Sequence, residues 1–406
     1  MTTTHIETSS NGLPAMLDFF DPGFHHHNPA VAAAREAHWY ARTPIGFAVL
    51  RYAEAAELLR DNRLKQGGVE FLAAQGVTEG PAADWMRHML LCVEGADHTR
   101  LRRLVSKAFT PRAVDKLRPH TRRLANELID GFAAAGECEF MSAFADRLPA
   151  LVISQMLEIP RELHEPCHHA VADLGQVFSW HVAQRLPRIE AAIARLDDII
   201  DTLVAERRSH PGDDLISALV AAHEAGDSLT DHELRQMVST LLFASQDTTR
   251  NQLGLAVATF AEHPDQWALL ARAPEQGAGA VEEVIRVNPA VPCIWRVAAE
   301  ELTYRDLYAQ AGTSVTIQTS AANTDPRVFG DAEFDITATR AARQLSFGAG
   351  PHSCLGMGLA RLELAEALPI LAQRLGPIRL ATEPTYLPPT TIYGPLTLPV
   401  RFTQVP

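Results

Sequence analysis

Cysteine is scarce in this sequence and forms no pattern that suggests a cross-linked or zinc-bound fold. The five cysteines among 406 residues are odd in number and never form a C-x-x-C pair; they are Cys92, Cys138, Cys167, Cys293 and Cys354. A disulfide framework and a structural zinc site are therefore both disfavoured, and a reducing cytoplasm is the compartment that fits.

Long hydrophobic runs and excess positive charge are also missing. No eighteen apolar residues follow one another, and residues 1–20 lack a basic start followed by an apolar run. We therefore expect a soluble, cytoplasmic protein that does not bind a membrane. With 36 Lys and Arg against 49 Asp and Glu, the net charge of -13 argues against a generic nucleic-acid binder. No repeat or linker divides the chain, so we expect an N-terminal tail at residues 1–27 and a single domain at 28–406.

The pattern of apolar and turn residues predicts mostly helices. Helical patterns fill residues 113–205, with breaks expected at Pro149, Pro160 and Pro187. Short strands are predicted within residues 289–298 and at 314–318.

The stretch from Phe347 to Gly356 places one cysteine at the end of a glycine-punctuated loop and at the start of a helix. Backbone N–H groups and the positive end of the helix dipole favour a thiolate there, so Cys354 is a candidate metal ligand or nucleophile. Gly348 and Gly350 permit turn conformations that side chains forbid, and Gly356 allows a flat partner to approach closely. The alternative is a buried, inert cysteine.

A long apolar helix is predicted from Thr230, its N-cap, to about Glu262. Asp247 and Thr248 lie in its middle, where polar side chains reduce the stability of the protein unless their polar atoms find hydrogen-bond partners. Polar residues at such positions in an apolar helix indicate a functional site. Thr248 can exchange protons with water, and Asp247 can connect it to solvent. Ala244 lies one turn earlier on the same face and is small enough to leave space. The alternative is an ordinary buried helix whose hydroxyl groups bond to i−4 carbonyls.

Two charged pairs lie at helical spacing. His98 and Arg102 are four residues apart, so both can donate to one anion, unless they belong to a solvated basic face. Glu283 and Arg286 are three residues apart, and as an exposed ion pair they would contribute little.

Taken together, these motifs resemble those of the cytochrome P-450 family. The loop F-G-x-G-x-H-x-C-x-G, followed by L-A-R, resembles the haem-ligand loop, and Ala244–Thr249 resembles the oxygen-activation motif A-G-x-D/E-T-T. The H-x-x-x-R and E-x-x-R pairs occur in the family's order. The resemblance implies a mainly α fold with small antiparallel β-sheets, in which haem b lies between the long central helix and the cysteine loop.

The resemblance also implies a role for each matching residue. Cys354 would be the axial thiolate ligand of the haem iron. The other residues expected to contact the haem are Phe347, Gly348, Gly356 and Ala244 around the ring, and His98, Arg102, Arg296 and His352 at the propionates. Thr248 would assist oxygen activation, Asp247 would relay protons, and the pair Glu283 and Arg286 would support the proximal side.

Three positions need separate treatment, because the sequence departs from the family pattern there. Ser245 stands where glycine is usual, and Thr324 replaces the arginine of A-N-R-D-P. The arginine that completes the network around Glu283 is either Arg340 or Arg343, and we predict Arg340.

The resemblance places one wall of a substrate pocket at residues 62–95, a lid around Val177, Phe178 and Trp180, and a turn at Pro388–Gly394. The three lid residues either face the pocket or pack in the core. Candidate substrate contacts are Phe71, Phe243, Ile294, Trp295 and Ile392. Their character suggests an apolar or aromatic small molecule.

The implied reaction inserts one oxygen atom from O₂ into this substrate. Electrons would come from NAD(P)H through a reductase and a ferredoxin, and the acidic donor would dock on a basic patch. That patch would consist of Arg100, Arg103, Lys107 and Arg112. A peroxide-driven enzyme and a non-catalytic haem-binding or sensor protein are the alternatives, and the pair Asp247 and Thr248 argues against both.

Overall fold

The computed structural model describes residues 14–19, 21, 24–225, 229–330, 333–387 and 391–405. The chain forms two compact units, each assembled from several segments. Unit 1 comprises residues 1–67, 279–354 and 386–394, and unit 2 comprises residues 68–278, 355–385 and 395–406. Most elements are helices and the sheets are small, so the predicted mainly α class is confirmed.

Unit 1 is organised around a sheet with the strand order β1-β2-β8-β5-β3. These strands are β1 (Tyr40–Thr43), β2 (Gly46–Val49), β3 (Leu64–Gln66), β5 (Ile294–Ala298) and β8 (Ser314–Ile317). The strand predicted at 314–318 is confirmed, and β5 lies within the predicted 289–298. The pairs run antiparallel except for β2 and β8, which run parallel with Ala48 opposite Thr316.

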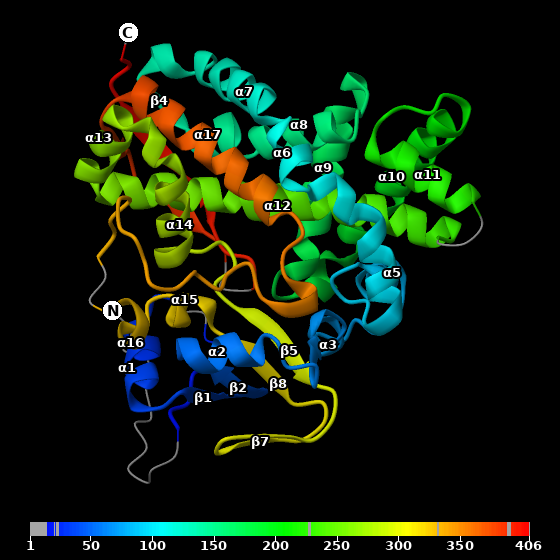
Figure 1. The fold of residues 1–406 in the computed structure, drawn as a ribbon, viewed down its shortest axis with the longest axis vertical. Coiled ribbons are helices and arrows are strands. Elements are labelled where there is room, and N and C mark those ends of the chain that lie inside the picture. Colours follow the sequence, from blue (N-terminus) through cyan, green and yellow to red (C-terminus); the bar gives the residue numbers. More distant parts are fainter. Residues whose placement is uncertain are drawn as a thin grey trace. The chain divides into compact units, whose positions relative to one another are not determined.

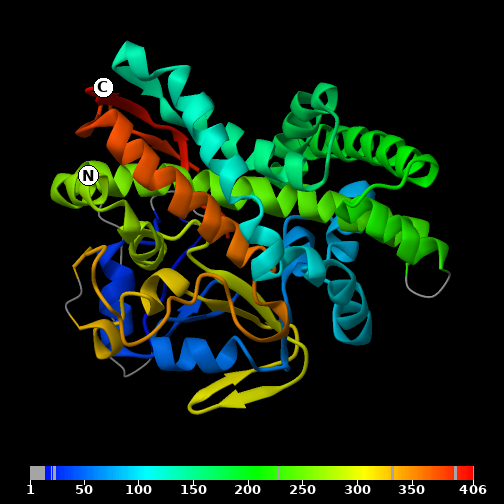
Figure 2. The same cartoon turned by 45° about the horizontal axis from the view of Figure 1, so that its top comes forward.

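Short helices and one hairpin complete unit 1. The helices are α1 (Pro29–Ala37), α2 (Tyr52–Leu58), α15 (Thr319–Ala322), α16 (Pro326–Phe329), the 3-10 turn η7 (Gly350–His352) and most of α14 (Gly277–Val287). The hairpin of β6 (Leu302–Tyr304) and β7 (Leu307–Ala309) extends away from the main sheet, as Figure 2 shows in yellow. Apolar residues of the sheet, such as Val49 and Val315, form the core with Leu58 of α2.

The described part of the predicted N-terminal tail is attached to unit 1. Met16 forms a bridge with Arg42, and the Leu17 N–H donates to the Arg42 carbonyl at 2.9 Å. Leu17 and Phe24 are buried in a small core with Val31. The rest of the tail, residues 1–13, 20, 22 and 23, lies outside the described residues.

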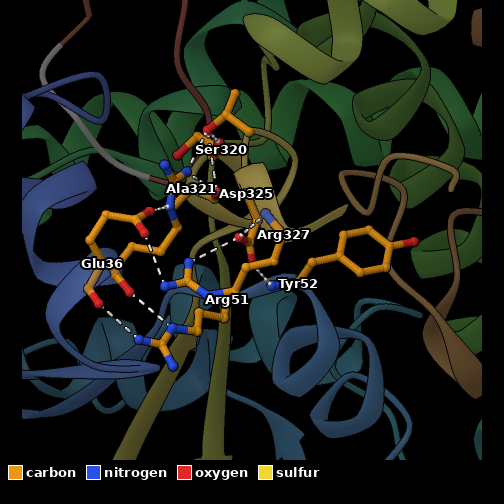
Figure 3. Close-up of polar contacts among 9 residues, drawn as sticks. Glu36, Arg51, Tyr52, Ser320, Ala321, Asp325 and Arg327 are labelled. Carbon is orange, nitrogen blue, oxygen red and sulfur yellow. Dashed lines mark hydrogen bonds and ion pairs between the residues drawn. The ribbon is translucent and has the colours of Figure 1, made fainter. Parts of the chain in front are cut away.

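A buried arginine of α1 forms hydrogen bonds to the segment around Thr324. At position 324 the family pattern has arginine. The Arg35 guanidinium donates to the Ala321 carbonyl (2.7 Å) and to Thr324 Oγ1 (2.9 Å). The neighbouring Asp325 accepts the Tyr52 N–H at 3.0 Å and so joins this segment to α2 (Figure 3). A guanidinium from another part of the chain therefore lies beside position 324.

Unit 2 is built around α12 (Asp231–Glu262), the long helix that the sequence predicts. Thr230 Oγ1 accepts the Glu233 N–H (3.1 Å), while the Glu233 carboxylate accepts the Thr230 N–H (2.8 Å). This reciprocal capping box fixes the start of the helix and confirms Thr230 as its N-cap. Arg100 of α5 (Gly95–Ser106) also donates to the Glu233 carboxylate at 2.5 Å, so one side chain caps α12 and holds α5.

The other helices of unit 2 pack against α12 or against one another, and Figure 1 shows α17 lying between α7 and α12. Besides α5 they are α3 (Gly68–Ala73), α4 (Pro81–His88), α6 (Pro111–Asp115), α7 (Arg118–Asp130), α8 (Arg147–Met156), α9 (His164–Leu174), α10 (Val182–Ser209), α11 (Leu215–Glu224), α13 (Pro264–Arg272) and α17 (Met357–Leu375). Short helical turns are η1 (Lys107–Phe109), η2 (Ala133–Ala135), η3 (Met141–Ala145), η4 (Arg161–Leu163), η5 (Gly175–Phe178) and η6 (Pro274–Gln276). Among the residues that the structure describes, no helix combines the length and hydrophobicity that a bilayer-spanning segment needs.

Small sheets lie beside these helices. Strands β4 (Glu137–Glu139), β12 (Pro399–Phe402) and β9 (Ile378–Leu380) pair in that order, all antiparallel, and β10 (Thr385–Tyr386) pairs with β11 (Pro395–Thr397).

Two of the three predicted proline breaks are wrong. Pro149 is the third residue of α8, where a missing N–H costs nothing because first-turn N–H groups have no helical partner. Pro187 lies inside α10, near its start, and the helix continues with one backbone hydrogen bond fewer. Pro160 does separate two helices, α8 and α9.

Candidate functional site

In unit 1, the loop from Leu345 to Cys354 is closed by its own backbone hydrogen bonds. The Cys354 N–H donates to the Phe347 carbonyl and the Gly348 N–H donates to the Leu345 carbonyl, both at 2.8 Å. Gly348 and Gly350 have φ angles of 67° and 73°, in the left-handed region that favours glycine, as the sequence predicts. Cys354 is exposed, so it is not the buried cysteine of the alternative interpretation.

Strand β5 carries three predicted site residues beside this loop. Ile294 faces the loop, since a Cβ at Gly348 would lie 3.5 Å from Ile294 Cδ1. Trp295 packs against Gly67, where a Cβ would lie 2.4 Å from its ring, and strand alternation sends it away from Ile294. Arg296 follows and is 3% exposed. Of the two pocket candidates on β5, Ile294 is therefore the one next to the cysteine loop.

The other predicted residues of unit 1 differ in their burial. His352 and Phe347 are both half-buried, with His352 in the turn η7. Ile392 is 9% exposed, and its neighbour Tyr393 is anchored by an N–H bond to the Ala290 carbonyl at 2.9 Å. Residues 388–390 of the predicted pocket turn lie outside the described residues.

Glu283 and Arg286 form a buried ion pair rather than an exposed one. Arg286 donates to the two carboxylate oxygens of Glu283 at 2.7 and 2.9 Å. Arg340 donates to the same carboxylate at 2.5 Å, which confirms the choice of Arg340 over Arg343. Burial alone would raise the pKa of Glu283, but the hydrogen bonds from both arginines outweigh it and lower that pKa.

In unit 2, α12 is buried on most sides but has an open face at Ala244. Phe243 and Gln246 are buried, whereas Ala244 is exposed and Thr248, one turn later, is half-buried. The helix runs through Ser245 without interruption. The Thr248 hydroxyl donates to the Ala244 carbonyl at 3.3 Å, the i−4 bond that the alternative interpretation expects.

Asp247 begins a chain of polar contacts that the sequence alone did not reveal. Asn251 Nδ2 lies 2.9 Å from the Asp247 carbonyl and 3.5 Å from its carboxylate. Arg250 donates to Asn251 Oδ1 at 3.0 Å and forms an ion pair with Asp146. Burial raises the pKa of Asp247, and the charge of Arg250 only partly opposes this. The i+4 spacing of Asp247 and Asn251 was the available signal for this contact.

Helix α5 carries the predicted pair of unit 2. His98 is 3% exposed and Arg102 is half-buried, so the two do not form the solvated face of the alternative interpretation. Of the predicted basic patch, Arg100 is held in ion pairs with Asp97 and Glu233. The remaining members are exposed; they are Arg103, Lys107 and Arg112.

The family model for Cytochrome P450 matches residues 61–270 and 278–376 of the chain. The chain belongs to the cytochrome P-450 family. Luteothin monooxygenase from Streptomyces thioluteus is 43% identical to this P-450 over 405 residues, covering 99% of both chains. Mycinamicin IV hydroxylase/epoxidase from Micromonospora griseorubida is 36% identical, over 88% of this chain and 91% of its own. The structure of P450BioI in complex with acyl carrier protein ligated to hexadec-9Z-enoic acid matches with a TM-score of 0.84 at 30% identity, over 93% of this chain and 99% of its own.

This P-450 is a monooxygenase that uses haem iron, as its family and its named relatives establish. The residues present fit such a cofactor. Unit 1 offers the exposed Cys354 at the end of a hydrogen-bonded loop and the buried guanidinium of Arg296. Unit 2 offers the exposed Ala244 of α12 and the buried imidazole of His98. A thiol for iron and cationic groups for carboxylates are the donors that haem requires.

Aromatic rings gather on the α12 face next to Asp247. Phe243 stacks on Phe178 with ring centroids 5.2 Å apart and meets Trp85 edge-on at 5.6 Å. Phe71 packs against Trp180 at 5.2 Å. Of the predicted lid residues, Val177 and Phe178 are buried, which fits the core-packing alternative, and Trp180 is half-buried.

Proposed function

We propose that this P-450 inserts one atom of O₂ into an apolar small molecule, with luteothin the first compound to test. Full-length identity of 43% with luteothin monooxygenase is the observation that carries the choice of compound. We further propose that the cofactor is haem b, because the sequence contains no C-x-x-C-H motif for covalent attachment. Residues 28–406 would act as one domain in the cytoplasm.

In this proposal Cys354 ligates the haem iron, and Phe347, Gly348 and Gly356 border the sulfur. The propionates are held by four residues: His98, Arg102, Arg296 and His352. When bound, haem iron activates O₂ with two electrons and gives one oxygen atom to the substrate. Ala244 leaves space on its face of α12.

Asp247 and Thr248 move protons to the place where O₂ is reduced. The pKa of Asp247 is raised by burial, which suits a group that must both hold and release a proton. Asn251 and Arg250 link Asp247 to the partly exposed Asp146 through hydrogen bonds and an ion pair. These contacts would hold the Asp247 carboxyl in position, because a guanidinium has no lone pair with which to pass protons on.

The substrate is apolar but carries hydrogen-bonding groups. Gln236, Thr240 and Ala244 lie at i+4 spacing along α12. Gln236 Oε1 and Thr240 Oγ1 are shielded from solvent and have no hydrogen-bond partner in the described parts of the chain. An unmade buried hydrogen bond costs about 1–3 kcal/mol, which a substrate with matching polar groups recovers. The aromatic cluster around Phe243 and the side chains of Ile294 and Ile392 supply apolar contacts, and Trp295 remains the outer candidate.

Electrons reach this P-450 from NAD(P)H through a reductase and a ferredoxin. Arg103, Lys107 and Arg112 are exposed on consecutive turns of α5, η1 and α6, while the protein as a whole is acidic. Such a basic patch attracts an acidic donor. Reversing the charge of Arg103 and Lys107 should slow reduction by ferredoxin most at low salt.

The proposal is tested by spectroscopy and by product coupling. Reduced protein exposed to carbon monoxide should show the red-shifted band of thiolate-ligated haem, and luteothin should shift the spin state of the oxidised protein. Thr248→Ala should then consume reducing equivalents and release peroxide, whereas the adjacent Thr249→Ala, which removes a hydroxyl from another face, should stay coupled. No thiolate band, or tight coupling in Thr248→Ala, would contradict the proposal.

A further inference from the structure

Two helices of unit 2 bring one carboxylate and two imidazoles together. Asp84 and His88 lie one turn apart on α4, and His232 is the second residue of α12. Asp84 Oδ1 is 3.2 Å from His88 Nδ1, and Asp84 Oδ2 is 3.6 Å from His232 Nε2. The two imidazole rings are 4.5 Å apart between centroids. One donor atom from each residue falls within 4.8 Å of the other two.

These separations match those between the ligands of a tetrahedral metal ion. Zinc binds imidazole nitrogen and carboxylate oxygen at about 2.0–2.2 Å, which places neighbouring ligand atoms roughly 3.3–3.5 Å apart. His88 Nδ1 also lies 2.9 Å from the Asp84 carbonyl, which accepts its proton, so a metal that binds Nδ1 has to displace this proton. The cluster therefore closes around a cation by loss of one proton and by small side-chain adjustments.

His232 provides a second, independent indication. Its Nε2 is shielded from solvent and has no hydrogen-bond partner among the described residues, since 3.6 Å to Asp84 is too long for a hydrogen bond. A nitrogen in this state costs stability, and coordination to a metal removes that cost.

Charged side chains surround the cluster. Asp197 of α10 lies near His232 and is 3.9 Å from Arg235. Arg87 competes for Asp84 from 3.5 Å but is itself half exposed, so it can move aside.

We propose that Asp84, His88 and His232 bind one zinc ion that ties α4 to the first turn of α12, with water as the remaining ligand. Two imidazoles and one carboxylate form a donor set that zinc accepts, and a three-residue site leaves one position open. This metal site does not depend on the monooxygenase proposal. Because α4 belongs to the segment 62–95 expected to border the substrate, zinc would restrict the movement of that segment.

The test titrates zinc into the chelator-treated, haem-loaded full-length protein and measures binding by calorimetry. One zinc should bind, and His88→Ala, His232→Ala and Asp84→Asn should each weaken binding at least tenfold. His169→Ala is the matched control, because His169 is an exposed helical histidine whose nearest carboxylate, Glu165, is 3.9 Å away. It should bind zinc like the wild type. Undiminished binding in His88→Ala or His232→Ala, or no saturable binding at all, would overturn the proposal.

X-ray absorption and hydrogen exchange check the ligands and the tie between helices. The zinc edge should give nitrogen or oxygen neighbours at about 2.0–2.1 Å, whereas sulfur at about 2.3 Å would assign the metal to a cysteine and refute the site. Zinc should slow amide exchange in α4 of the wild type and leave it unchanged in His232→Ala. Equal exchange with and without zinc in the wild type would refute the tie.

Discussion

The buried network around Glu283 gives a sharp prediction for the stability of this P-450. Glu283→Gln keeps the shape of the side chain and removes its charge. The side chains of Glu283 and Arg286 are only 4% and 3% exposed, so the substitution leaves a guanidinium buried without its counter-charge. Breaking a buried pair in this way costs about 3–5 kcal/mol.

Arg340→Gln provides the internal comparison. The Arg340 side chain is 23% exposed, and without it Glu283 still keeps both bonds from Arg286. We therefore expect a loss of about 1–2 kcal/mol, because solvent replaces part of the lost contact. The ratio of the two losses in unfolding free energy shows whether Glu283 stabilises the protein as one partner of a buried charge pair or only through ordinary hydrogen bonds.

Urea unfolding of the haem-loaded variants, followed by circular dichroism and by haem absorbance, measures both losses. The effect of Glu283→Gln should shrink as the pH falls. The native state lowers the pKa of Glu283 below its ordinary value of 4.5, so its stabilising effect is present above pH 4.5 and is lost as the pH falls through the native pKa. A loss below about 1 kcal/mol at neutral pH, or a loss no larger than that of Arg340→Gln, would refute the reasoning.

Three further predictions concern single contacts. Glu363 is 1% exposed and burial raises its pKa well above 4.5, so Glu363→Gln should be the more stable form at neutral pH, with the difference vanishing below pH 4.5 in urea titrations. Gln75 bonds to the Ser179 carbonyl and the Val182 N–H, so Gln75→Ala should speed amide exchange at residues 179–182, and unchanged exchange would deny it this role. Arg35→Met should cost about 1–3 kcal/mol in urea unfolding, and adding Thr324→Arg should recover part of the loss; no recovery would contradict the substitution of one guanidinium for the other.

Local chemistry made several features predictable from the sequence. Thr230 and Glu233 specify the start of α12 through their own hydrogen bonds, and the glycines of the cysteine loop specify its turns, so both were recognisable within ten residues of chain. Arg340 was predicted correctly because its partner Glu283 had been identified through a motif.

Contacts between distant segments were not predictable in the same way. Arg35 contacts Thr324, which is 289 positions away in the sequence, and His232 contacts Asp84, which is 148 positions away. No pattern in the neighbouring residues predicts such a contact. The proline breaks failed for a different reason, since the cost of Pro149 depends on its position within a helical turn rather than on its identity. The packing of Phe243 between Trp85 and Phe178 likewise depends on tertiary structure.

The bond between Arg35 and Thr324 sets a rule for recombining this enzyme with its relatives. A chimera that takes residues 1–60 from a relative with arginine in the A-N-R-D-P segment, and the remainder from this chain, inherits Thr324 without any assurance of a guanidinium from α1. The reverse chimera brings Arg35 against a second arginine and places two like charges in one buried space. Chimeras should therefore have either no crossover or an even number of crossovers between positions 35 and 324, so that both residues come from the same parent.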